Sequence, residues 1–144
     1  MIAIGCDHGG LALKEEIIAH LKELNYEFND MGTYDEKSID YPDIAKKVCA
    51  EIIENRASLG ILVCGTGIGM SICANKIKGI RAAQCTDTFS AKMTRRHNNS
   101  NVLTLGGRIL GPELAKEIVD AFLTNEFEGG RHQTRIDKIL ELEK

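Results

Sequence analysis

The most constraining feature of the sequence is a short apolar run that leads directly into a glycine-rich stretch. Residues 59–64 read Leu-Gly-Ile-Leu-Val-Cys, and residues 65–69 read Gly-Thr-Gly-Ile-Gly. An apolar run without polar alternation is typical of a strand that is covered on both faces, as in a parallel sheet. Because glycine permits tight turns, the sequence predicts a buried strand, a loop rich in accessible backbone amides and then a helix.

The same alternation of strands and helices runs along the chain. The expected strands are residues 2–6, 26–29, 59–64, 80–85 and 102–105. Helix-start signals follow several of them, at Asp40, Asp87 and Gly111, and Gly129-Gly130 precedes a short last helix. Parallel strands need crossovers, so the pattern predicts an α/β fold in which a five-stranded parallel sheet lies between two helical layers, in one domain over residues 1–144.

Composition excludes several classes of protein. The formal net charge is -3 and the chain lacks tryptophan, which argues against a nucleic-acid-binding protein. No apolar run is long enough for a membrane span, and no signal-peptide pattern is present. Five cysteines without a Cys-x-x-Cys pair predict a reduced, cytoplasmic protein, and no residue spacing suggests a metal site.

Two loops are candidates for the ligand site, because open α/β sheets bind ligands beyond the carboxyl ends of their strands. The loop after residue 64 offers the amides of Gly65–Gly69 and the hydroxyl of Thr66, a combination that favours an anion. The alternative is that the glycines merely allow a tight turn. Met70 breaks the dinucleotide fingerprint, no Gly-Lys-Ser/Thr follows, and no arginine stands six residues after Cys64, so the known phosphate-loop classes do not fit.

Cys64 differs from the other cysteines because it stands where the strand meets the amide-rich loop. A helix N-terminus favours the thiolate, so Cys64 is a candidate base or nucleophile. The alternative is a small buried apolar residue, which is the interpretation for the four other cysteines.

Two histidines and a carboxylate are further candidates. Asp7 and His8 follow the first strand in the position that matches Cys64, although Asp7 is equally suited to capping a turn. His97 ends a predicted helix, and a helix C-terminus favours a protonated imidazole that can donate a proton. A surface location is the alternative for His97.

A basic cluster follows Gly129-Gly130. Arg131 and Arg135 lie on one helical face beside His132, and two guanidinium groups are suited to clamp a phosphate monoester. A solvated helix start is the alternative. With the thiol and the histidines, these residues predict proton transfer on a small phosphorylated substrate.

Motifs along nearly the whole chain resemble those of the ribose-5-phosphate isomerase B family, whose superfamily includes galactose-6-phosphate isomerase subunits and enzymes of allose 6-phosphate. The resemblance implies aldose to ketose isomerisation in pentose phosphate metabolism, without cofactor or metal, on a Rossmann-like fold. The motifs are Gly5-Cys6-Asp7-His8-Gly9-Gly10, Asp40-Tyr41-Pro42, Cys64-Gly65-Thr66-Gly67-Ile68-Gly69, Ala74-Asn75-Lys76, Arg95-Arg96-His97-Asn98 and Glu128-Gly129-Gly130-Arg131-His132.

The resemblance also implies roles for individual residues. Cys64 resembles the base that moves a proton between C1 and C2, and some relatives instead carry a glutamate at the position of Met70. Thr66 and His97 resemble the groups that open the sugar ring, with Asp7 nearby. The amides of Gly65, Thr66, Gly67, Ile68 and Gly69 are implied to hold the enediolate oxygens, and His8, Arg131 and Arg135 to hold the phosphate. Asn98 and Arg108 are implied to complete the sugar or phosphate contacts, and Tyr41 resembles a residue that lines the cleft.

The family resemblance further implies a homodimer or homotetramer in which each site is shared. His97, Asn98 and Arg108 are then expected from the partner of the chain that supplies Cys64, and the C-terminal helix is expected to pack on the partner subunit. Two alternatives stay open from sequence. One is a hexose-6-phosphate isomerase, which needs room for one more carbon, and the other is a sugar-phosphate-binding protein without catalysis.

Overall fold

The computed structural model describes residues 1–144 and contains one parallel sheet. The strand order is β2-β1-β3-β5-β4, so β3 lies at the centre and β2 and β4 lie at the edges. The predicted α/β class and five-stranded parallel sheet are confirmed. The strands are β1 Ile2–Cys6, β2 Phe28–Asp30, β3 Leu59–Cys64, β4 Ala82–Gln84 and β5 Val102–Gly106.

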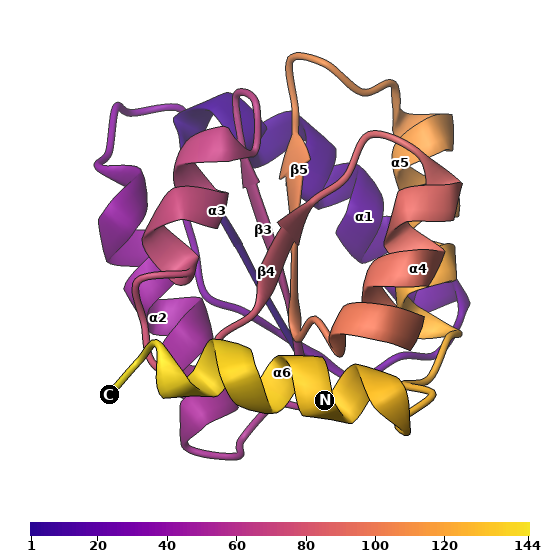
Figure 1. Cartoon of the computed structure of the whole chain (residues 1–144). Coiled ribbons are helices and arrows are strands. Elements are labelled where there is room, and N and C mark those ends of the chain that lie inside the picture. Colours follow the sequence, from indigo (N-terminus) through magenta and orange to yellow (C-terminus); the bar gives the residue numbers. More distant parts are fainter.

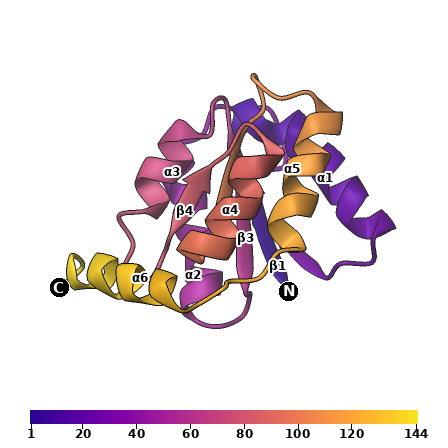
Figure 2. The same ribbon diagram turned by 45° about the vertical axis from the view of Figure 1, so that its right-hand side comes forward.

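Helices cover both faces of the sheet, which confirms the predicted three layers. Helices α1, α4 and α5 lie on one face, and α2 and α3 lie on the other (Figures 1 and 2). Helix α6 lies apart from both layers and runs across the bottom of the molecule in Figure 1. The helices are α1 Leu11–Glu23, α2 Tyr41–Ile53, α3 Ile68–Ala74, α4 Thr88–Asn98, α5 Pro112–Leu123 and α6 Arg131–Glu141, with a 3-10 turn at His8–Gly10.

The central strand β3 separates two hydrophobic cores. Ile61 and Val63 point into the core under α1 and α5, whereas Leu62 and Cys64 point into the core under α2 and α3. This alternation follows from the two-residue period of a strand. The Cys64 side chain therefore lies on the α2–α3 side, at the carboxyl end of the central strand.

Two edge strands are shorter than the sequence predicts, for local reasons. β2 starts at Phe28 because the N–H of Tyr26 bonds the carbonyl of Leu21 and so closes the end of α1. β4 starts at Ala82 because the N–H of Arg81 bonds the side chain of Asn101 at 2.8 Å.

The loops after β1, β3 and β5 meet at the carboxyl edge of the sheet. The N–H of Asp7 donates to the carbonyl of Val63 at 3.1 Å, and that of Gly107 donates to the carbonyl of Cys64 at 2.8 Å. The chain leaves β1 for the edge strand β2 and then returns to β3 on the other side of β1, so strand order reverses here. This is the position where such sheets bind ligands. None of the helices has the length and apolarity to cross a membrane.

Candidate functional site

Cys64 lies at the end of β3 with its sulfur turned toward the glycine-rich loop. Its Sγ accepts a hydrogen bond from the N–H of Gly67 at 3.1 Å, although the residue is only 5% exposed. Gly67 has φ of 81°, in the left-handed region that favours glycine, and a Cβ there would lie 2.9 Å from the Leu105 backbone. The backbone of this glycine thus holds the thiol at the loop.

The amides of residues 65–69, which we call the amide loop, are only partly used within the chain. The N–H of Ile68 donates to Thr66 Oγ1 at 3.2 Å, whereas those of Gly65, Thr66 and Gly69 donate to no atom of the chain. Free N–H groups of this kind bind oxyanions. Because α3 has only seven residues, the amides themselves, rather than the helix dipole, carry this capacity.

Asp7 caps the turn that follows β1. Its Oδ1 accepts a hydrogen bond from the N–H of Gly9 at 2.9 Å, and the residue is buried. The capping interpretation of Asp7 is therefore confirmed. The turn also packs against the amide loop, because a Cβ on Gly9 would lie 3.2 Å from the nitrogen of Gly65.

Arg108 and Tyr41 border the amide loop from either side. A guanidinium nitrogen of Arg108 would lie 3.3 Å from a Cβ on Gly65, and the N–H of Arg108 donates to the Gly65 carbonyl at 3.0 Å. The ring of Tyr41 would lie 2.7 Å from a Cβ on Gly69, so only glycine leaves room for it. The family resemblance implies that Arg108 comes from a partner subunit. In this structure, however, Arg108 lies against the amide loop of its own chain.

His8 lies on the turn after β1 and is held by the segment that precedes α2. Its Nδ1 is 3.3 Å from the backbone nitrogen of Ile39, which donates a hydrogen bond to it. The other ring nitrogen, Nε2, has no partner among the hydrogen bonds of the chain.

Three of the other cysteines have the properties of buried structural residues. Burial raises the pKa of Cys6 to about 11, of Cys49 to about 12 and of Cys85 to about 11. Thiols of this kind stay protonated at neutral pH and are poor nucleophiles. Their predicted role as small apolar residues agrees with this placement.

His97 and His132 form a second cluster around Glu128, at the end of α4 and the start of α6. The two imidazole rings are stacked, with centroids 4.1 Å apart and planes 11° apart. The Nε2 atom of each lies 3.7 Å from Glu128 Oε1, while Arg96 Nε lies 2.5 Å from Oε2. The stack was not predicted, because 35 residues separate the two rings.

The electrostatics of this cluster oppose protonation of one ring. Burial lowers the pKa of His132, and the positive charges of His97 and Arg131 lower it further against the opposing effect of Glu128. Partial burial raises the pKa of Glu128, but the hydrogen bond and charge of Arg96 with the charges of both histidines outweigh it, so the pKa lies below its usual value.

The cluster brings three ligand atoms of metal-binding type within 4.8 Å, yet it does not fit a metal ion well. Arg96 occupies one oxygen of Glu128, and the neighbouring Arg131 and Arg135 repel a cation.

The chain does not bring its two groups of predicted site residues together. Cys64, the amide loop, Asp7, His8, Tyr41 and Arg108 lie at the carboxyl edge of the sheet. Helix α4 starts after β4, and its 11 residues span about 16 Å toward the opposite edge of the sheet, with His97 and Asn98 as the last two. Arg131 and Arg135 are exposed on α6, at the same far end (Figure 1). A phosphate clamp of His8 with both arginines is therefore not formed within one chain.

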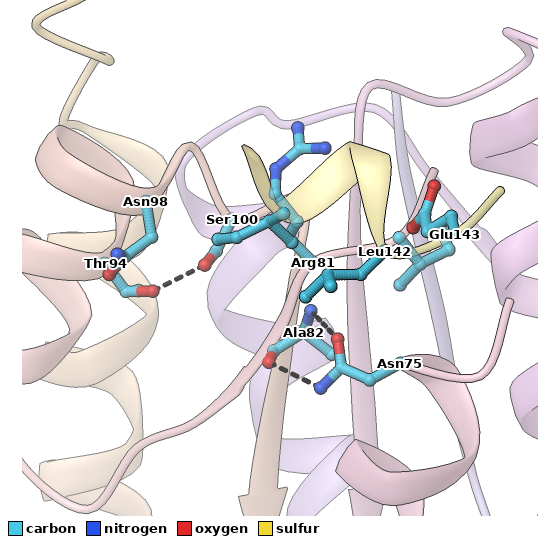
Figure 3. Close-up of a pocket in the computed structure, with 10 residues that line it drawn as sticks. Asn75, Arg81, Ala82, Thr94, Asn98, Ser100, Leu142 and Glu143 are labelled. Carbon is cyan, nitrogen blue, oxygen red and sulfur yellow. Dashed lines mark hydrogen bonds between the residues drawn. The ribbon is translucent and has the colours of Figure 1, made fainter. Parts of the chain in front are cut away.

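The largest cavity belongs to this far end rather than to the amide loop. It measures about 490 Å³ and lies between the edge strand β4, the end of α4 and α6. Figure 3 shows the side-chain amide of Asn75 facing the backbone of Ala82, with which it exchanges hydrogen bonds of 2.8 and 3.0 Å. Glu143 accepts the N–H of Gly79 and holds the end of the chain beside the cavity.

Two residues near the site escaped sequence reasoning. Glu128 lies within a motif, but its contact with His97 depends on tertiary structure. Lys14 is 1% exposed and pairs with Asp30 at 2.7 Å. Its burial could have been predicted from the sequence. Lys14 precedes Ile17 by three residues and Leu21 by seven, which places it on the apolar face of α1.

Fold and site together define an α/β protein in which a thiol and free backbone amides meet at the carboxyl edge of the sheet, an arrangement suited to a small anionic ligand. The family model described as Ribose/Galactose Isomerase matches residues 2–139. The chain therefore belongs to the ribose/galactose isomerase family.

Individual relatives are similar over almost the whole chain. Ribose-5-phosphate isomerase B of Escherichia coli strain K12 is 50% identical over 143 residues, covering 99% of this chain and 96% of the relative. The solved structure of Clostridium thermocellum ribose-5-phosphate isomerase B is 51% identical with a TM-score of 0.97, covering 99% of this chain and 96% of that one. The Thermotoga maritima ribose 5-phosphate isomerase structure is 54% identical with a TM-score of 0.96, covering 97% of both chains.

Proposed function

We propose that the protein is an aldose–ketose isomerase that interconverts ribose 5-phosphate and ribulose 5-phosphate. The observation that carries this proposal is the position of Cys64, whose sulfur faces an amide loop with unused N–H groups. Relatives named for this activity share half of the sequence over almost the full length. The family membership and the local chemistry therefore point to the same reaction.

In the proposed reaction, the Cys64 thiolate removes the proton from C2 of the open-chain aldose. The electron pair moves to the carbonyl oxygen at C1, and the free N–H groups of Gly65, Thr66 and Gly69 stabilise the enediolate oxygens. A proton moves from O2 to O1, and the thiol returns its proton to C1. C1 is reduced and C2 is oxidised within one molecule, so the step balances without an external oxidant or reductant.

Ring opening precedes this step and needs a proton donor and an acceptor. We assign it to His97 and Thr66, with Asp7 nearby. The exposed hydroxyl of Thr66 is free to approach a ring oxygen or the anomeric hydroxyl. The phosphate is assigned to His8, Arg131 and Arg135, and Tyr41, Asn98 and Arg108 contact the sugar or the phosphate.

The separation of the two residue groups supports a site shared between subunits. His97, Asn98, Arg131 and Arg135 lie too far from Cys64 of the same chain to contact one small sugar. We propose a homodimer or homotetramer in which this group approaches the amide loop of a partner. Arg108 is assigned to the chain that supplies Cys64, because it contacts that chain's Gly65. The five free cysteines fit a reducing cytoplasm.

Turnover measured with three sugar phosphates tests the proposal. We expect ribose 5-phosphate to be converted with higher kcat/KM than allose 6-phosphate or galactose 6-phosphate. A preference for either hexose phosphate would identify a hexose-6-phosphate isomerase. Binding of all three without turnover would overturn catalysis and leave a sugar-phosphate-binding protein.

A further inference from the structure

We propose that the segment Met31–Ile39 fixes His8 as the neutral imidazole that carries its proton on Nε2. Lys14 holds the start of this segment in place. His8 then meets a phosphate as a hydrogen-bond donor. This inference deepens the proposed function, since it rests on His8 as a phosphate ligand. It assigns positioning roles to Lys14 and to the backbone of Ile39.

The tautomer follows from the direction of one hydrogen bond. A backbone N–H can only donate, so the 3.3 Å contact from Ile39 requires a lone pair on Nδ1 of His8. A neutral imidazole has one N–H, which must then be on Nε2. Nε2 bonds no other atom of the chain and is therefore free to donate to a ligand.

The segment is tied to the sheet at its start. The N–H of Cys6 donates to the carbonyl of Gly32 at 2.6 Å, and the N–H of Thr33 returns to the carbonyl of Cys6 at 2.8 Å. Further along, the hydroxyl of Tyr34 donates to the carbonyl of Asp30 at 2.9 Å. The segment thus bridges from the end of β1 to His8, two residues beyond that strand.

Lys14 anchors this segment from within the core. Its ammonium donates to Asp30 Oδ1 at 2.7 Å and to the Thr33 carbonyl at 2.6 Å, and it lies 5.0 Å from the ring centroid of Tyr34. Asp30 Oδ1 also accepts the N–H of Gly32 at 3.0 Å. One buried charge therefore fixes three residues at the base of the segment that presents the Ile39 N–H.

Replacement of Lys14 is expected to loosen the segment without unfolding the protein. Removing one partner of a buried ion pair is destabilising to the extent that the other charge stays buried and unpaired. The Asp30 side chain is 27% exposed, so water can solvate the carboxylate that Lys14 leaves. Lys14→Met is therefore the primary variant, and Lys22→Met, at an exposed position of the same helix, is its matched control.

The test is long-range 1H–15N correlation spectroscopy of the full-length, 15N-histidine-labelled protein, with His8→Gln to assign the His8 signals. We expect free wild-type protein to show a protonated Nε2 and an unprotonated Nδ1 at His8. In Lys14→Met we expect averaging between the two tautomers of His8. We expect KM for ribose 5-phosphate to rise about fivefold, which corresponds to the loss of one hydrogen bond, and kcat to change less than twofold. Lys22→Met should match wild type in all three.

A proton on Nδ1 in wild type would overturn the proposal, and an unchanged tautomer and KM in Lys14→Met would overturn the role of Lys14. If Lys14→Met does not fold, Ile39→Pro removes the donor N–H directly. In that variant we expect the same averaging between the two tautomers of His8. The tautomer is read without substrate, so absence of turnover with every sugar phosphate would sink the proposed function and leave the tautomer result standing.

Discussion

The N–H of Gly67 donates a hydrogen bond to Sγ of Cys64 at 3.1 Å, and this contact joins the end of the central strand to the amide loop. That sulfur makes no other hydrogen bond within the chain. A side chain that otherwise packs beside Met70 in an apolar core is thereby directed toward the loop that would hold the substrate oxygens. The Cys64 sulfur thus takes part in core packing and also faces the proposed substrate site. Substitution of Cys64 by another small residue tests its chemical role while the packing is largely kept.

We expect Cys64→Ala to lower kcat/KM for ribose 5-phosphate by about 1,000-fold while sugar-phosphate binding persists, because general-base catalysis typically contributes about 100- to 10,000-fold. Incorporation of deuterium from D2O at C1 or C2 should be lost in parallel. Cys73→Ala, on the neighbouring helix, is the matched control and should retain activity. Near-normal turnover by Cys64→Ala would remove this thiol from the mechanism.

Gly67→Ala should destabilise the protein by at least about 2 kcal/mol, because an L residue in the left-handed region costs about 1–2 kcal/mol and the added Cβ meets the Leu105 backbone. Gly111→Ala is the control, since that glycine has φ of -71° and no atom within 4 Å of a Cβ. We expect its effect to stay within about 0.5 kcal/mol. Equal midpoints of urea unfolding for both variants would contradict this account of the loop.

His97→Asn should impair conversion of ribose 5-phosphate more than conversion of erythrose 4-phosphate. The phosphate ester on O4 prevents the tetrose from closing a furanose ring, so it needs no ring opening. The comparison is the ratio of kcat/KM between wild type and variant for each substrate. An equal loss on both substrates would assign His97 to binding or to the proton transfer itself.

The sequence predicted those parts of the fold that local pattern determines. The apolar run of β3 and the glycines after it define strand, loop and helix within residues 59–74, and Asp87 caps α4 as expected by accepting the N–H of Ser90. Strand β4 was predicted too long. The N–H of Arg81 donates to the side chain of Asn101, the residue just before β5, and so does not join the sheet. Such a contact between distant residues leaves no local pattern.

The candidate site was predictable in its residue types but not in its arrangement. Cys64 and the amide loop are adjacent in sequence, so their contact could be expected. The position of α6 depends instead on tertiary contacts, such as burial of Ile136 and the Glu143 contact to Gly79, and its separation from His8 could not be read from the sequence. The same holds for the buried pair of Lys14 and Asp30, which only folding brings together.

A shared site predicts recovery of activity when two inactive variants are mixed. If Cys64 and His97 of one site come from different chains, a mixed dimer of Cys64→Ala and His97→Asn has one site with both native residues. Refolding an equimolar mixture should then restore about a quarter of wild-type activity, since half of the dimers are mixed and each has one intact site. Mixing Cys64→Ala with Cys64→Ser is the control and should restore nothing. Lack of recovery in both mixtures would place each site within one chain.

The stacked pair of histidines predicts a pH dependence of stability. Burial and the charges of His97 and Arg131 hold the pKa of His132 below its usual 6.5, so the unfolded chain binds a proton more readily than the folded one. The stabilisation from a neutral His132 is therefore complete above pH 6.5 and is lost as the pH falls through the lower folded value. Urea unfolding between pH 7.5 and 5 should show a steeper loss for wild type than for His132→Gln. Gln133→Ala, an exposed change on the same helix, should follow wild type, and parallel curves for wild type and His132→Gln would contradict the assignment.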